Sequence, residues 1–363
     1  MKPPSMCRFF AIIALLFTIS CNQEKEEVNA IVVCGNLRPS NDEHKGFYTT
    51  PSGERIYLKS SYANTAVHDM VQAGNDIYCA GTTWNSPDFK IAVYWKNGEP
   101  TYVTDGKHNA LIQQIAVNGT DVYCVGCEQT GSWHTNWRNE KLFRFNVAKC
   151  WKNGKLLYTL TNGKKGGCAN GIYIDPDNRV HIVGFDNFLL EWYQYAWVRT
   201  KKACFWIDGK RQDLDNHRYS DASTIVGDGK KIYISGWISS FEYDGDEKDI
   251  YWENGWRKAL SDGRQGNSYF HSARIFNGNY YLCGYYEESK FKTPAYWVNG
   301  QYVPLREIGA SVFDISVVGE DVYCAGDNGY APGIWKNGKF KKISEESGYL
   351  TGIIVYPNTT ESL

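Results

Sequence analysis

The sequence lacks an excess of charge of either sign. Its 363 residues include 39 Lys and Arg against 40 Asp and Glu, which gives a formal net charge of −1. A nearly neutral chain has no strong field to attract nucleic acid or an anionic membrane surface. We therefore expect no nucleic-acid partner, and we expect any partner to be recognised through shape and local chemistry.

The chain also lacks the motifs of several catalytic and metal sites. No H-E-x-x-H, G-x-S-x-G or phosphate-binding glycine loop occurs. Cys124 and Cys127 form a C-x-x-C motif, but residues three apart on a strand point to opposite faces, and no second pair follows. We predict no metal and no cofactor. We expect the cysteines to pack as small hydrophobic residues. After residues 1–20, nine cysteines remain besides Cys21, an odd number, so at least one is free or pairs with another chain.

Long hydrophobic runs are nearly absent as well. The apolar run from Phe9 to Ile19 is too short to span a bilayer, and it follows the basic residues Lys2 and Arg8. This arrangement is typical of a signal peptide. Residues 1–20 are therefore predicted to be a signal peptide.

The end of this run, LFTISC, resembles the lipobox of bacterial lipoproteins. The resemblance implies that the chain is cleaved before Cys21 and that Cys21 is acylated; the alternative is an ordinary soluble signal peptide. Residues 21–29 then form a charged, flexible tether. Its Lys25-Glu26-Glu27 run resembles an acidic signal that sends some Gram-negative lipoproteins to the outer surface. We expect a protein of the bacterial cell envelope, anchored to the outer membrane through the lipid alone.

Internal repeats dominate what is present. Six segments share a small residue, two mostly apolar residues, Trp, any residue, Asn or Asp, and Gly: AVYWKNG, AKCWKNG, ACFWIDG, DIYWENG, PAYWVNG and PGIWKNG. Each follows an alternating run ending in Gly, such as DVYCVG, and an earlier run such as LIQQIAV. Alternation bounded by Asn-Gly or Asp-Gly predicts antiparallel hairpins. Four strands in a period of roughly 40 to 55 residues indicate the blade of a β-propeller. The repeated tryptophans are predicted to be packing residues.

Two incomplete repeats at the ends set the expected blade count. The N-terminal fragment, IVVCG, GFYTT and RIYLKS, lacks a first strand, whereas the C-terminal YLTGIIVYP is a first strand alone. We predict an all-β, seven-bladed propeller over residues 30–357, with four antiparallel strands per blade and a tail at 358–363. Pairing of Ile353–Tyr356 with Ile31–Gly35 would close the ring and remove exposed edge strands. The repeats resemble seven-bladed propellers and a group of Gram-negative envelope lipoproteins.

The two faces of such a propeller differ in sequence. One face has short Asn-Gly or Asp-Gly turns, which set strand register. On the other face, the loops between the second and third strands vary in length and sequence, as binding loops on a rigid scaffold do. We call it the variable face. Its aromatic residues suit stacking on sugars or packing against a protein, although they could instead form private clusters. They are Trp84, Trp133, Trp137, Trp192, Tyr193, Tyr195, Trp197, Trp237, Tyr243, Tyr285 and Tyr286.

A gapless match of the first strands predicts which residues surround the central channel near the variable face. The first predicted column is His68, Gln113, Asn170, Ser223, His271, Phe313 and Thr351. The second is Asp69, Gln114, Gly171, Thr224, Ser272, Asp314 and Gly352. Together they would form a mainly polar collar. His68 and His271 are candidate ligand-binding residues or bases, but imidazoles here more often hydrogen-bond a neighbouring strand.

Three functions follow as hypotheses. The first is a binding module that holds a glycan or a protein on the variable face. The second is a polysaccharide hydrolase or lyase with acids drawn from Asp69, Asp314, Glu191 and Asp246, and the third is a structural partner in a larger envelope complex. Carboxylates about 5 to 9 Å apart in a pocket would favour the enzyme. Without that geometry, we favour binding over catalysis.

Overall fold

The computed structural model describes residues 30–357, apart from 41–42, 87–88, 136–140, 194–195, 215–218, 240–246, 261–266, 289–290 and 307–308. The predicted signal peptide, Cys21, the tether and the C-terminal tail lie outside the described residues. Among the described residues, no helix is long and apolar enough to cross a membrane.

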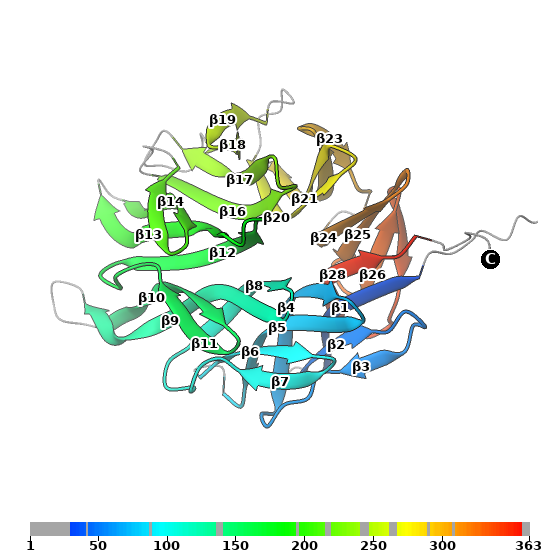
Figure 1. Ribbon diagram of the computed structural model, residues 1–363, viewed down its shortest axis with the longest axis horizontal. Helices are drawn as coiled ribbons and strands as arrows, with labels where there is room; N and C mark the ends of the chain where they lie inside the picture. The colour runs from blue at the N-terminus through cyan, green and yellow to red at the C-terminus, as the bar shows by residue number, and fades with distance from the viewer. Residues whose placement is uncertain are drawn as a thin grey trace, which may run out of the picture.

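Five sheets contain four antiparallel strands each (Figure 1). Within each sheet the strands pair in chain order, apart from the last strand of the chain, which precedes the first. These sheets are β28 (Gly348–Val355), β1 (Ile31–Ser40), β2 (Glu43–Thr49) and β3 (Arg55–Tyr57); β4 (Asn64–Ala73), β5 (Asp76–Trp84), β6 (Ile91–Lys96) and β7 (Glu99–Tyr102); β8 (Ala110–Asn118), β9 (Asp121–Thr135), β10 (Lys141–Lys152) and β11 (Lys155–Thr159); β20 (Asn267–Phe276), β21 (Asn279–Glu288), β22 (Phe291–Val298) and β23 (Gln301–Pro304); and β24 (Ser311–Val318), β25 (Asp321–Asp327), β26 (Pro332–Lys336) and β27 (Lys339–Lys342).

The sixth sheet has eight strands and corrects the predicted blade count. Its first set is β12 (Gly166–Ile174), β13 (Val180–Tyr193), β14 (Ala196–Ile207) and β15 (Lys210–Asp213), and its second is β16 (Tyr219–Gly227), β17 (Ile232–Ser239), β18 (Glu247–Glu253) and β19 (Trp256–Ala259). One parallel pairing of Lys201 with Tyr219 joins the two sets. Five four-stranded blades therefore stand as separate sheets, not the seven predicted, because this pairing merges two predicted blades.

The two ends of the described chain pair with each other. In β1 and β28, Ile31 lies opposite Val355, Val32 opposite Ile354 and Val33 opposite Ile353. The C-terminal strand thus supplies the first strand that the N-terminal fragment lacks, as the two incomplete repeats predicted. The first strands of successive sets, which we call the inner strands, also contact one another in the order β28, β4, β8, β12, β16, β20 and β24, and β24 contacts β28.

Every inner strand carries a β-bulge at the same place. In β4, Val67 lies opposite Gly81 and Asp69 opposite Ala80, so His68 is left unpaired. The glycine is required because a Cβ on Gly81 would lie 1.9 Å from the carbonyl oxygen of Ala66. Equivalent glycines in the other second strands would clash at 1.8 to 2.5 Å. The seven unpaired residues are His68, Gln113, Asn170, Ser223, His271, Phe313 and Thr351.

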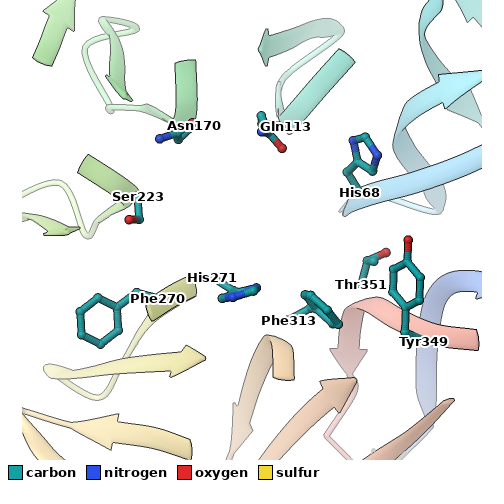
Figure 2. Close-up of a pocket in the computed structure, with 9 residues that line it drawn as sticks. All are labelled: His68, Gln113, Asn170, Ser223, Phe270, His271, Phe313, Tyr349 and Thr351. Carbon is teal, nitrogen blue, oxygen red and sulfur yellow. The ribbon is translucent and has the colours of Figure 1, made fainter. Parts of the chain in front are cut away.

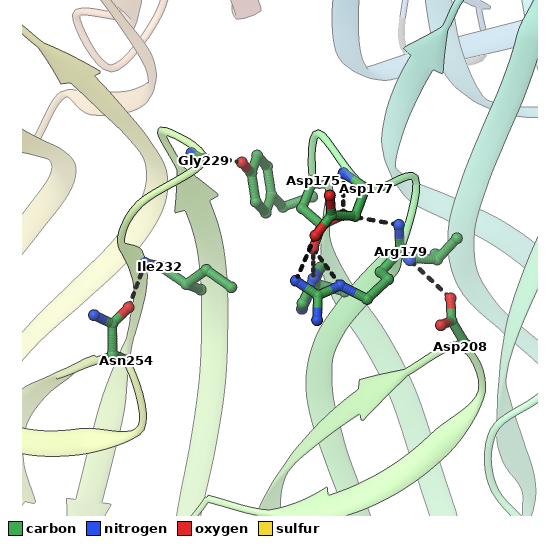
Figure 3. A network of polar contacts seen from close by, with 10 residues as sticks. Asp175, Asp177, Arg179, Asp208, Gly229, Ile232 and Asn254 are labelled. Atoms are coloured by element: carbon green, nitrogen blue, oxygen red, sulfur yellow. Dashed lines mark hydrogen bonds and ion pairs between the residues drawn. The ribbon is translucent and has the colours of Figure 1, made fainter.

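The repeated Asn or Asp of the hairpin turns has a definite structural role. Asn254 adopts the left-handed conformation with φ 50°, which Asn tolerates better than most residues. Its side-chain oxygen accepts the N–H of Ile232 at 2.8 Å, at the start of the second strand of the same set (Figure 3). Asp208 binds the N–H of Val180 in the same way at 2.9 Å. The turn therefore links the third strand to the second, and it explains the Asn-Gly and Asp-Gly repeats.

The six repeated tryptophans are core residues, as predicted, with at most 2% of each side chain exposed. Each packs against the preceding set of strands; Trp95, for example, joins a cluster with Tyr48 and Leu58. The Trp95 ring also donates a hydrogen bond to the carbonyl of Lys59 at 2.7 Å. The tryptophans therefore hold neighbouring sets of strands together.

The cysteines also pack as predicted. All nine in the described chain are free and buried. Cys79, Cys124 and Cys324 lie directly opposite Trp95, Trp151 and Trp335 on the neighbouring strand. A small apolar side chain at these positions leaves room for the indole, so the cysteines need no redox role to account for their place.

We predict that Trp151→Ala and Trp297→Ala each lower the free energy of unfolding by about 3 to 5 kcal/mol, because a large cavity opens between sets of strands. Trp256 is the matched control, since 78% of it is exposed. Trp256→Ala should change stability by less than about 0.5 kcal/mol. Denaturant unfolding of the three variants tests this, and equal losses at buried and exposed positions would contradict it.

Candidate functional site

A cavity of about 400 Å³ opens among the inner strands. We call it the channel mouth, and Figure 2 shows the side chains around it. Its lining contains the whole first column predicted from the sequence, together with two further aromatic residues. The lining residues are His68, Gln113, Asn170, Ser223, Phe270, His271, Phe313, Tyr349 and Thr351.

Three of these side chains donate hydrogen bonds to the next inner strand. His68 donates from Nδ1 to the carbonyl of Ile112 at 2.6 Å, and Thr351 donates to the carbonyl of Val67 at 3.3 Å. Asn170 donates from Nδ2 to the carbonyl of Ala222 at 2.9 Å. Each acceptor comes just before the unpaired residue of its strand. His68 therefore has the strand-bridging role expected of an imidazole at this position.

These bonds decide what the side chains can offer a ligand. The Asn170 Nδ2 group also donates to Asp221 Oδ1 at 3.0 Å, so both of its hydrogens are used and its carbonyl oxygen remains as an acceptor. The neutral His68 ring likewise keeps Nε2 as an acceptor, and burial lowers the pKa of His68, which favours that neutral form. This part of the mouth is suited to hydroxyl groups that donate hydrogen bonds.

The opposite wall of the mouth is aromatic. The His271 ring lies 5.0 Å from Phe313 and 5.8 Å from Tyr285, and Phe313 lies 5.4 Å from Tyr349. The surrounding protein desolvates the charged form of His271, and the positive charge of Lys292 also disfavours it. Together they lower the pKa of His271 to about 4, although part of the ring faces solvent. A neutral imidazole thus continues the row of rings. This wall can stack against the apolar face of a ligand.

The second predicted column does not line the mouth. Asp69 and Gln114 instead line a second cavity of about 400 Å³, further along the inner strands, with Arg274 and Ser316. Asp69 accepts the N–H of Ile115 at 2.9 Å, and Gln114 accepts the N–H of Ile172 at 2.6 Å. The collar expected from both columns is therefore made by the first alone, because side chains after the bulge bridge neighbouring strands.

The carboxylates proposed for catalysis do not meet at the mouth. Asp314 accepts hydrogen bonds from Ser272 at 2.6 Å and from Arg274 at 2.9 Å, so its charge is paired. Burial raises the pKa of Asp69 to about 7. The side chains of Glu191 and Asp246 lie outside the described residues. None of the residues that line the mouth is a carboxylate, and no three His, Cys, Asp or Glu of the described chain gather as a metal site.

The predicted aromatic residues of the variable face occupy different environments. Trp84 and Tyr286 are buried, whereas Trp237 and Tyr285 are half-buried. Tyr285 stacks on Tyr269 with ring centroids 4.7 Å apart, next to His271 of the mouth. Trp137, Tyr195 and Tyr243 lie outside the described residues, as do the side chains of Trp133, Trp192, Tyr193 and Trp197.

Several aromatic residues of this region were not predicted. Tyr349 lines the mouth two residues before Thr351 on the same strand, a spacing that strand alternation could have flagged. Phe270 also lines it. Phe89 and Tyr330, which lie in loops of the variable face, are 56% and 64% exposed. They could have been found only by treating every loop aromatic as a candidate.

A buried carboxylate at the opposite face has a structural role. Asp175, in the turn after β12, accepts hydrogen bonds from His181 Nε2 at 2.9 Å and from Arg179 Nε at 2.7 Å (Figure 3). Although burial opposes ionisation, these bonds lower the pKa of Asp175 to about 2. The group stays ionised and holds the turn, so it is a reference for the titration of Asp69.

Comparison with known proteins identifies the fold of the chain but not its family. No family model and no curated protein matches the chain. The β-propeller domain of the trilobed protease from Pyrococcus furiosus aligns with 88% of this chain and 96% of its own length at a TM-score of 0.52 and 13% identity. A puromycin-hydrolyzing peptidase of Mycobacterium tuberculosis aligns with 87% of this chain at 0.54 and 11% identity, and the match spans about half of that peptidase, 53%. The chain therefore has a β-propeller fold.

Asp69 should make stability depend on pH. Its pKa is raised from the ordinary value of 3.8 to about 7 in the folded protein, so the folded state binds the proton more tightly. The associated stability is complete below about pH 4 and is lost as the pH rises to about 7. Asp69→Asn should flatten this decline in unfolding experiments, whereas Asp175→Asn should leave it in place. An unchanged slope in Asp69→Asn would contradict the assignment.

Proposed function

We propose that this chain is a binding module that holds a sugar in the channel mouth on its variable face. The observation that carries the proposal is the set of seven bulge residues, whose amide, hydroxyl, imidazole and ring groups surround one cavity. Sugars present hydroxyl groups at their edges and apolar C–H faces, so they need hydrogen-bond partners beside an aromatic wall. Asn170 and His68 offer acceptors on one side, and Phe313 and Tyr349 offer rings on the other. A cavity of about 400 Å³ falls within the usual range for small-molecule sites.

Binding is favoured over hydrolysis by the state of the carboxylates. A glycosidase needs two carboxyl groups about 5 to 9 Å apart across the scissile bond. In the described chain, Asp314 is paired with Arg274, and Asp221 is paired with Lys201 at 2.8 Å. The polysaccharide hydrolase or lyase thus has less support than the binding module. A protein ligand remains the alternative occupant, through the exposed rings of Phe89 and Tyr330.

We also propose that the two halves of the eight-stranded sheet act as separate blades, so that seven blades form a closed ring. The support is the regular bulge, which recurs once in each half of that sheet. Asn36 adds a link across the junction of the chain ends, because its amide donates to the carbonyl of Val67 and accepts the N–H of Val67, both at 2.8 Å. A closed ring would fix the width of the mouth.

We further propose that the module is held at the bacterial outer membrane by a lipid on Cys21, and by no other membrane contact. The support is the lipobox-like LFTISC sequence. Cys21→Ser should then leave the protein soluble and unacylated, as measured by membrane fractionation and by mass spectrometry of the N-terminal peptide. If the variant still sediments with membranes through its folded body, the anchor is not the sole attachment.

The sugar site is tested with two mouth variants. Gln113→Ala removes an exposed amide, and Phe313→Ala removes a ring from the aromatic wall. After a glycan array has identified bound oligosaccharides, each variant should weaken binding of the strongest one by about 1 kcal/mol, roughly fivefold, in calorimetric titrations.

Leu156→Ala is the control, because Leu156 is 53% exposed on the outer strand β11. It should bind as the unmodified protein does. Unfolding curves for all three variants separate lost binding from lost folding. Binding that is unchanged in both folded mouth variants would overturn the site.

A further inference from the structure

Two cations near the mouth have no carboxylate partner among the residues that the structure describes. The guanidinium of Arg38 lies 5.8 Å from the ring centroid of Tyr349, a mouth residue, and the ammonium of Lys90 lies 5.2 Å from the ring of Trp84. Neither cation forms an ion pair with any carboxylate of the described chain. A cation over an aromatic ring keeps most of its capacity to bind an anion, because the ring contributes only a modest attraction.

His44 feels the charge of both cations. Its ring lies 5.4 Å from Trp84. Burial lowers the pKa of His44, and the positive charges of Arg38 and Lys90 lower it further, so both charges act at this imidazole. Lys90 also lowers the pKa of His68 inside the mouth. We call Arg38 and Lys90 the basic rim.

Several other cations of the described chain are paired with carboxylates. Lys149 pairs with Glu128, Lys201 with Asp221 and Arg211 with Asp186, so these charges are neutralised locally. Glu43, the acidic residue beside His44, is itself paired with Lys45 at 2.7 Å. Lys292 lies near His271, but it is directly opposite Glu287 in the sheet, so it does not carry the argument. Among the described residues of β1, β2 and the loop before β6, Arg38 and Lys90 are cations that form no ion pair with a carboxylate, and each lies over an aromatic ring.

We propose that the ligand of the mouth is an acidic glycan, whose carboxylate or sulfate group is bound by Arg38 and Lys90 while its ring occupies the mouth. The inference rests on the proposed sugar site and specifies the class of sugar. The mouth lining supplies groups for hydroxyls and ring faces but no cation. The rim supplies Arg38 beside Tyr349 and Lys90 over Trp84. A charged group on a sugar held against Tyr349 would therefore meet Arg38.

The experiment uses a glycan array that contains uronate, sialylated, sulfated and neutral oligosaccharides, together with methyl esters of the uronates. We expect the bound oligosaccharides to be acidic and to lose at least tenfold in affinity as methyl esters, which keep the ring but remove the charge. Arg38→Gln and Lys90→Gln should each weaken acidic ligands by about tenfold, the loss expected for one charge-assisted hydrogen bond. Affinity should also fall between 50 and about 300 mM salt, because the site is partly exposed.

Lys96→Gln is the matched control. Lys96 also lies over an aromatic ring, 5.5 Å from Tyr78, but it is paired with Asp76 near the turn before β7. This variant should bind acidic glycans as the unmodified protein does.

Neutral oligosaccharides that bind as tightly as acidic ones, or rim variants that bind acidic ligands unchanged, would overturn the acidic specificity and leave the sugar site standing. Absence of binding to every glycan would overturn both proposals.

Discussion

The site depends on one constraint: in each second strand, one glycine lies very close to the backbone of the neighbouring inner strand. At Gly326 and Gly284, a Cβ would lie 1.8 Å from a backbone carbonyl oxygen, so only glycine permits the bulge that follows. The bulge leaves one inner-strand residue outside the ladder and turns its side chain toward the mouth. Because this geometry recurs in every inner strand, seven side chains from distant parts of the chain surround one cavity.

The same geometry couples the fold to the chemistry of the mouth. The side chains of His68, Asn170 and Thr351 donate hydrogen bonds to backbone carbonyls of the next inner strand. They therefore hold neighbouring strands together, and these donor groups are not available to a ligand. What remains toward a ligand is a set of acceptors, beside rings contributed by other bulges. The core tryptophans pack between neighbouring sets of strands, and Trp297 also contacts Phe270 of the mouth, with ring centroids 5.1 Å apart. The surface that we propose for binding is therefore built by the inner strands, whose geometry repeats, whereas the loops above it vary in length and sequence.

The mouth could be predicted from the sequence where a repeated local signal marked it. A gapless match of the repeated inner strands placed His68 and Phe313 in one column. The second column was wrong because the bulge breaks the alternation, so Asp69 and Gln114 reach along the strands to the next N–H. The merging of two sets depends on a single pairing of Lys201 with Tyr219, for which the sequence has no signal. Burial of Trp84 likewise depends on contacts with distant parts of the chain, namely His44 of β2 and Lys90 of the loop before β6.

The role of the glycines can be measured directly with Gly326→Ala and Gly319→Ala. Gly319 has a φ of +59°, and no heavy atom lies within 4 Å of the place that an added methyl group would take. Alanine there should cost only about 1 to 2 kcal/mol of unfolding free energy for the left-handed backbone. At Gly326 the new methyl group would collide with the carbonyl of Ser311, and the cost should reach about 3 kcal/mol or more. Denaturant unfolding that shows this difference would support the account. Equal losses at the two positions would mean that the bulge does not depend on the glycine, and would contradict it.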